Sequence, residues 1–109
     1  SWSSENRSPL MRIPAGTGEY RRAELRSPDP GLNPYIAFSL MIYAGLDGIE
    51  NKRELPIAAN CNLYKADAET LAGFKQLPQN WETARRAAEN SAFIREHLPA
   101  TIIAAYCRR

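Results

Sequence analysis

The sequence predicts an α+β fold, because β-like and helical patterns occupy separate parts of the chain. Short β-like runs lie within the first 30 residues, and helical patterns fill most of the chain from Pro34 onward. Segregation of this kind is typical of folds in which helices pack against a small antiparallel sheet. We expect a few antiparallel strands over about residues 8–27, followed by packed helices over about residues 34–109, in a single domain spanning residues 1–109.

Two strands are expected before the first helix. They cover Pro9 to Ile13 and Tyr20 to Arg26, and the loop "PAGTGE" between them contains two glycines that permit a tight reversal. The simplest interpretation is a hairpin or a pair of neighbouring strands. The following stretch, "SPDPGLNP", ends the regular pattern because each proline lacks a backbone donor and restricts the residue before it.

The first helix is expected from Pro34 to about Asp47. Asn33 can cap the exposed backbone amides, and proline is well tolerated at the first helical position. We expect Gly45 and Gly48 to end this helix. Its apolar residues point in nearly all directions, which is typical of a helix covered on several sides.

Four further helical patterns follow a polar, irregular stretch that ends near Tyr64. Asp67 and Asn80 are the expected N-caps of the first two patterns. The patterns cover residues 67–76, 81–89, 92–97 and about 99–109.

Composition and charge exclude several classes of protein. Apolar residues make up 44% and charged residues 24%, as in a globular domain, and the net charge of +2 is too small for a surface devoted to nucleic acid or anionic lipid. Cys61 and Cys107 form no metal-binding or disulfide pattern, which indicates a reducing cytoplasm. No stretch is predicted to span a membrane or act as a signal peptide. Because the chain opens at Ser1 and its first methionine is Met11, we expect a piece of a longer protein.

A charged face is the main candidate for function. Arg22, Glu24 and Arg26 alternate along the second expected strand and therefore share one face, and Arg7 and Arg12 lie on the adjoining strand. Guanidinium groups bind phosphoryl and carboxylate oxygens, and a glutamate among them can ligate a divalent cation. The pattern is typical of a phosphoryl-transfer site. By pattern alone, however, a solvated face on which Glu24 bridges Arg22 and Arg26 is the more common explanation of such alternating charges.

Three ordered motifs resemble a known family. They are "NRSPLMRIP" at residues 6–14, "RRAELRSPDPGLNPYIAF" at 21–38 and "AGLDGIENK" at 44–52. They resemble the C-terminal part of the catalytic domain of glutamine synthetase. The resemblance is specific over residues 2–52 and fades beyond Tyr64.

The resemblance implies a role for each charged residue. Arg7 and Arg26 match catalytic arginines that hold the substrate glutamate. The arginine matched by Arg7 also contacts the phosphates of ATP, and the one matched by Arg26 also holds the transferring phosphoryl group. Arg12 and Arg22 match further arginines that face the nucleotide phosphates. Glu24 matches a carboxylate ligand of Mg²⁺ or Mn²⁺.

The implied reaction is the ATP-dependent ligation of glutamate and ammonia through γ-glutamyl phosphate. The family's other metal carboxylates and its ammonium pocket have no counterpart in these 109 residues, so we expect the chain alone to be inactive. The resemblance also implies a homo-oligomeric ring in the cytoplasm, with no nucleic-acid or membrane partner. Relatives that ligate glutamate to other amines remain an alternative, because no residue here selects the amine.

Two departures and one rival hypothesis accompany the resemblance. Glu19 stands where well-known bacterial members have a lysine near ATP, which puts nucleotide contact from that loop in doubt. Tyr64 lies near a tyrosine that some members adenylylate, but its surroundings differ, and an ordinary tyrosine is expected.

The rival hypothesis is a non-catalytic anion or nucleic-acid binding module, in which Tyr20 would be the one aromatic residue near the basic patch. The residues of that patch would be Arg7, Arg12, Arg21, Arg22 and Arg26.

Overall fold

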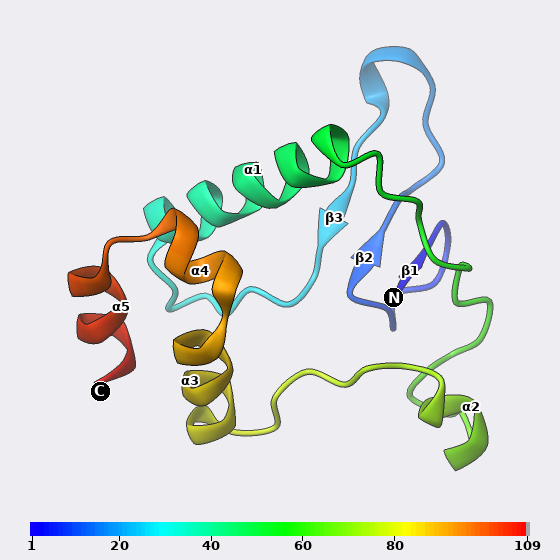
Figure 1. Cartoon of the computed structure of the whole chain (residues 1–109). Helices are drawn as coiled ribbons and strands as arrows, with labels where there is room; N and C mark the ends of the chain where they lie inside the picture. The colour runs from blue at the N-terminus through cyan, green and yellow to red at the C-terminus, as the bar shows by residue number, and fades with distance from the viewer. Residues whose placement is uncertain (109) are drawn as a thin grey trace. The chain divides into compact units, whose positions relative to one another are not determined.

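The computed structural model describes residues 1–108 and divides the chain into two compact units. The first unit comprises Ser1–Leu32 and Lys52–Lys75, and the second comprises Asn33–Asn51 and Gln76–Arg109. Strands occur in the first unit, whereas four of the five α-helices of the described chain lie in the second. The predicted α+β fold class is thereby confirmed (Figure 1).

The sheet of the first unit contains three two-residue strands in the order β1-β2-β3. These are β1 (Trp2–Ser3), β2 (Met11–Arg12) and β3 (Glu24–Leu25). The expected antiparallel pairing holds for β2 and β3, whereas β1 runs parallel to β2. The regular ladders are shorter than the expected runs at 9–13 and 20–26, although Arg26 N–H still donates to Leu10 O at 2.9 Å beyond β3.

Two glycines shape the loop between β2 and β3. Gly18 has a φ of 58°, a left-handed conformation that glycine adopts without steric cost. A Cβ on Gly16 would come within 2.8 Å of Tyr20 O, so the backbone can pass there only because the residue has no side chain. The loop also contains a short 3₁₀ turn, η1 (Gly18–Tyr20).

The sheet is completed by a segment that is distant in sequence. Trp2 Nε1 donates to Pro56 O at 2.6 Å, and Ala59 N–H donates to Trp2 O at 2.8 Å. Ala59 is buried against the strands. The short helix α2 (Ala68–Ala72) follows in the same unit, and Asp67 caps it by accepting from Thr70 N–H at 2.8 Å.

Helix α1 (Pro34–Glu50) begins where the sequence predicted but ends later. Asn33 caps its first turn through Oδ1, which accepts from two backbone amides. The expectation that Gly45 and Gly48 end the helix is wrong, because both lie within it. An interior glycine costs a helix only about 1 kcal/mol, so the backbone ladder continues until Asn51.

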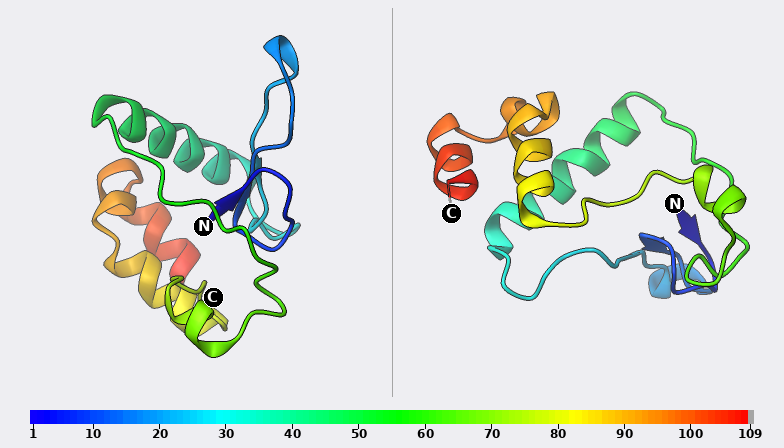
Figure 2. Two further views of the ribbon diagram at one scale, coloured as in Figure 1. Left: turned by 90° about the vertical axis from the view of Figure 1, so that its right-hand side faces the viewer. Right: turned by 90° about the horizontal axis from the view of Figure 1, so that it is seen from below.

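Three shorter helices complete the second unit. They are α3 (Trp81–Asn90), α4 (Ala92–His97) and α5 (Ala100–Cys107). Both views of Figure 2 show them side by side. The helix expected at about 99–109 corresponds to α5, and the expected end at residue 109 lies outside the described residues.

Helix α1 joins these helices through aromatic and polar contacts. The ring of His97 in α4 stacks on Tyr43 of α1, with 4.1 Å between the ring centroids, and Phe93 packs against His97 edge-on. Tyr106 of α5 accepts a hydrogen bond from Asn33 N–H at 2.8 Å. Within residues 1–108, no helix has the length and apolar character needed to cross a bilayer.

Candidate functional site

The centre of the candidate site is a cross-strand pair formed by Arg12 and Glu24. The antiparallel register of β2 and β3 places these residues directly opposite each other, so their side chains share one face of the sheet. Arg12 Nη1 donates to Glu24 Oε1 at 3.0 Å. Their side chains are 20% and 32% exposed, so the pair lies at the edge of solvent rather than in a dry interior.

Arg22 is the third member of this cluster. Its Nη2 lies 3.7 Å from the same oxygen, Glu24 Oε1, and its side chain is 59% exposed. Arg22 precedes β3 instead of lying within it, but its guanidinium still meets the Glu24 carboxylate, as the alternation of positions 22 and 24 predicted. The solvated-face alternative had Glu24 bridging Arg22 and Arg26, but here Arg12 takes the place of Arg26. A directly opposed residue on the neighbouring strand lies closer than a residue two positions along the same strand.

Arg26 and Arg7 remain outside this contact network. Arg26 follows β3 and is exposed, and Arg7 lies in the loop between β1 and β2 rather than on a strand. Within residues 1–108, neither guanidinium forms an ion pair. The structure thus joins three of the five predicted residues by contact and leaves two arginines available at the surface.

The cluster has the donors and the carboxylate that phosphoryl-transfer sites use. Arg12 and Arg22 offer several N–H groups to an oxyanion, and Arg12 Nε is buried without a hydrogen-bond partner. Glu24 is a suitable ligand for Mg²⁺ or Mn²⁺, but the described residues contain no group of three potential metal ligands. Glu24 can therefore offer one carboxylate to a divalent cation, without two further potential ligands beside it among residues 1–108.

Asn6 and Ser8, which flank Arg7, are polar residues whose role the sequence analysis missed. Asn6 Nδ2 donates a hydrogen bond to Cys61 O, and Leu63 N–H donates to Ser8 Oγ at 2.9 Å. The sequence signal that could have indicated their role is the placement of two hydrogen-bonding side chains, Asn6 and Ser8, on the two sides of an arginine. The partners could not be identified from sequence because they lie 55 residues further along the chain.

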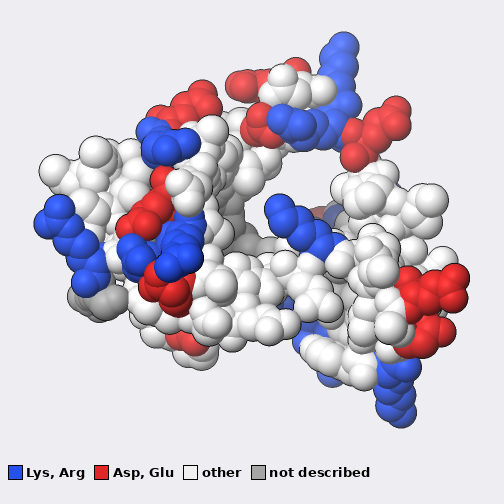
Figure 3. Space-filling view, turned by 60° about the horizontal axis from the view of Figure 1, so that its bottom comes forward, with Lys and Arg blue, Asp and Glu red and all other residues white. Residues whose placement is uncertain are grey.

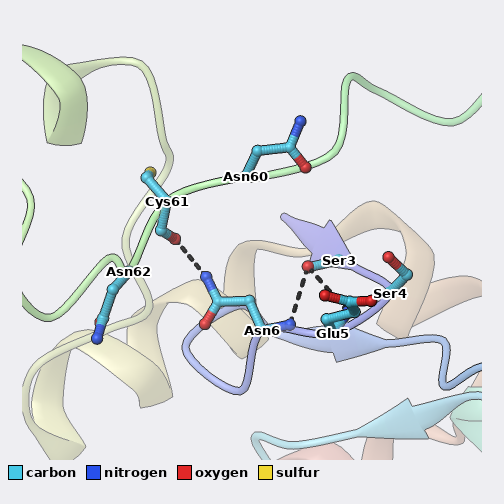
Figure 4. A pocket seen from close by; sticks show the side chains of 7 residues that line it. All are labelled: Ser3, Ser4, Glu5, Asn6, Asn60, Cys61 and Asn62. Carbon is cyan, nitrogen blue, oxygen red and sulfur yellow. Dashed lines mark hydrogen bonds between the residues drawn. The ribbon is translucent and has the colours of Figure 1, made fainter.

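A polar pocket of about 370 Å³ opens beside this loop (Figure 4). Asn6 and Cys61, which come from segments far apart in the sequence, lie next to each other in its wall and are joined by the Asn6–Cys61 hydrogen bond. Its complete lining consists of Ser3, Ser4, Glu5, Asn6, Asn60, Cys61 and Asn62.

Comparison with known proteins identifies the family. The family model for the glutamine synthetase catalytic domain matches residues 1–109. A glutamine synthetase of Staphylococcus epidermidis is 43% identical over 100 residues, and one of Staphylococcus aureus is 41% identical over 100 residues. In both cases the match covers 90% of this chain and 22% of the relative. The chain, which spans about a fifth of the length of these relatives, therefore belongs to the glutamine synthetase catalytic-domain family.

Proposed function

We propose that this chain forms part of the active site of an ATP-dependent glutamate–ammonia ligase that makes glutamine through γ-glutamyl phosphate. The observation that carries the proposal is the shared contact of Arg12 and Arg22 with Glu24, formed by residues of the family's motifs. Both staphylococcal relatives are named glutamine synthetases. Below, "the complete protein" is this chain joined to the rest of a glutamine synthetase catalytic domain.

Each charged residue has a role in this proposal. Arg7, Arg12 and Arg22 bind the phosphate oxygens of ATP. Arg7 and Arg26 hold glutamate, and Arg26 also holds the transferring phosphoryl group. Glu24 supplies one oxygen ligand to Mg²⁺ or Mn²⁺. The exposed guanidiniums of Arg7 and Arg26, which make no ion pair with residues 1–108, are available for anionic substrates.

Ligand binding would replace the contacts that the cluster makes now. Glu24 Oε1 is held by two guanidinium groups, and all three side chains reach solvent, which weakens ion pairs of this kind. Arg12 and Arg22 can therefore turn toward phosphate oxygens while the Glu24 carboxylate turns toward the cation. When bound, ATP and the cation supply the phosphoryl group and the neutralising charge for its transfer.

The decisive experiment is Glu24→Gln in the complete protein. The amide keeps an oxygen for Arg12 but carries no negative charge for a divalent cation. We expect kcat/KM for glutamine formation to fall about 100-fold or more, with partial recovery at high Mg²⁺ or Mn²⁺ concentration. The matched control is Glu69→Gln, an exposed glutamate in the first turn of α2, which should leave activity unchanged.

Two further measurements complete this test. Melting temperature and circular dichroism should remain close to those of the unchanged protein, because the Arg12–Glu24 pair is partly solvated. Equal activity of Glu24→Gln and Glu69→Gln would remove Glu24 from the metal site and refute the proposed role of the cluster.

Assembly and compartment are parts of the same proposal. We assign the complete protein to a homo-oligomeric ring in the cytoplasm, as family membership suggests. Cys61 and Cys107 are both free, which supports a reducing compartment. The mass of the purified complete protein in sedimentation experiments tests the assembly.

A further inference from the structure

The loop that carries Arg7 is folded around its own polar side chains. Ser3 Oγ, at the end of β1, accepts from Asn6 N–H at 3.1 Å and from Glu5 N–H at 3.4 Å. Asn6 Oδ1 in turn accepts from Ser8 N–H at 3.0 Å and from Ser8 Oγ–H at 2.9 Å. Asn6 and Ser8, on the two sides of Arg7, are therefore tied to each other, and Asn6 is tied to the end of β1 through Ser3. Figure 4 shows the bond between Ser3 and Asn6.

The same two side chains fix the loop to the segment 61–63. Asn6 donates through Nδ2 to Cys61 O, while Ser8 Oγ accepts from Leu63 N–H at 2.9 Å. Both atoms of the Asn6 amide are used, and the Ser8 hydroxyl donates one bond and accepts another. These two direct bonds cross 55 residues of sequence, so they hold the loop where local chain stiffness alone would not.

Arg7 itself has no such anchor. Its side chain is exposed, and within residues 1–108 it makes no ion pair. An arginine has a long side chain with considerable rotamer entropy, so its capture of an anion depends on where the backbone presents it. Asn6 and Ser8 fix that backbone on both sides.

We propose that Asn6 and Ser8 are positioning residues for Arg7, with the segment 61–63 as the surface against which they hold the loop. This inference rests on the proposed function, because it assumes that Arg7 binds the phosphates of ATP. It extends the anion site beyond the charged motif to the backbone groups of Cys61 and Leu63, which act on Arg7 through their hydrogen bonds with Asn6 and Ser8.

The test is Ser8→Ala in the complete protein, assayed by steady-state kinetics. The variant removes the acceptor for Leu63 N–H and the donor to Asn6. We expect KM for ATP to rise about tenfold, a size typical of a misplaced binding group, with a smaller change in kcat. Ser8→Thr keeps the hydroxyl and should restore the original KM. The matched control, Ser4→Ala, makes the same chemical change on an exposed side chain of the same loop and should have no effect.

A double-variant cycle separates positioning from general stability. If Ser8 acts through Arg7, Ser8→Ala should add nothing to the KM of an Arg7→Ala protein. Amide hydrogen exchange provides a readout independent of activity, because Leu63 N–H should lose protection in Ser8→Ala and keep it in Ser4→Ala.

Each contrary outcome has a distinct meaning. An unchanged KM in Ser8→Ala, with Leu63 deprotected and Arg7→Ala impaired, would overturn the positioning role alone. Full activity of Arg7→Ala would overturn the proposed role of Arg7 and the inference with it. If Ser8→Ala does not fold, Ser8→Cys keeps the shape with a weaker acceptor and should show a smaller rise in KM, and an unchanged KM there would also refute the inference.

Discussion

At the scale of single residues, Glu24 is held by weak contacts that a ligand can replace. One carboxylate oxygen receives Arg12 at 3.0 Å and Arg22 at 3.7 Å, and all three side chains reach solvent. Water and salt screen such pairs, so they orient the side chains without locking them. The ion pairs keep two guanidiniums and one carboxylate beside each other, which is the arrangement that the proposed binding of ATP and a divalent cation requires.

Arg21 and Arg22 provide a test of this arrangement, because only Arg22 belongs to the Glu24 cluster. In the complete protein, Arg22→Ala should raise KM for ATP about tenfold through the loss of a charge-assisted hydrogen bond, whereas Arg21→Ala should change it little. Steady-state kinetics with varied ATP measures both.

The same pair of variants tests the rival nucleic-acid hypothesis. A nucleic-acid module would lose oligonucleotide affinity equally with either arginine, since phosphate contacts contribute through charge alone. Acidic and basic side chains are interspersed over the face shown in Figure 3, which disfavours that module. Salt-dependent oligonucleotide binding that weakens to the same extent in both variants would support it and contradict the phosphate role of Arg22.

The sequence predicted part of this site for a definite physical reason. Strand alternation placed Arg22 and Glu24 on one face, because side-chain direction follows from local backbone geometry. The partnership of Arg12 with Glu24 depends on the register between two strands, which local pattern does not define. Asn6 and Ser8 were missed for a related reason, since their partners lie far away in sequence.

At the scale of elements, helix starts were predicted better than helix ends. Asn33, Asp67 and Asn80 all cap the helices that the sequence assigned to them, because a cap is a local contact between a side chain and nearby amides. The end of α1 was misplaced because glycine weakens a helix without forbidding it. Lys52, with a φ of 46°, lies just beyond the true end.

Helix α3 carries a charge network with a predictable pH dependence. Hydrogen bonds from Arg85 and then from Arg86 lower the pKa of Glu82 below its ordinary value of 4.5. The Glu82 carboxylate therefore takes up a proton more readily in the unfolded chain than in the folded helix. The stabilisation by Glu82 is fully present above pH 4.5 and is lost as the pH falls through the lower, folded pKa.

Nuclear magnetic resonance titration of the Glu82 carboxyl group in the 109-residue chain measures this pKa. We expect a midpoint below 4.5, and Arg85→Ala should move the midpoint back toward that value. Ala87→Ser, on the same helix, leaves the network intact and serves as the control. A midpoint at or above 4.5 in the unchanged chain would show that the arginine contacts do not persist in solution.

At the scale of the whole molecule, the described chain has little core of its own. Within the part that the structure describes, the buried apolar residues are Pro9, Pro14, Ala59 and Cys107, all of them small, while α1 exposes several large side chains, including Phe38 at 62% and Ile42 at 63%. These two residues are four positions apart and lie on one helix face. Exposed apolar area of this kind favours association with other protein surfaces.

This exposure leads to a prediction for the isolated 109-residue chain. It should synthesise no glutamine, because Glu24 offers one metal ligand where a phosphoryl-transfer site needs several, and it should self-associate through the apolar face of α1. Sedimentation velocity over a range of concentrations measures association, and a coupled assay for glutamine measures activity. The double variant Phe38→Lys/Ile42→Lys should shift the chain toward monomer, whereas Gln76→Lys/Gln79→Lys adds the same charge at exposed polar positions and should not. If the unaltered chain stays monomeric at high concentration, the apolar face of α1 does not drive self-association. If the isolated chain makes measurable glutamine, residues 1–109 contain more of the groups that the reaction needs than Glu24 and the arginines.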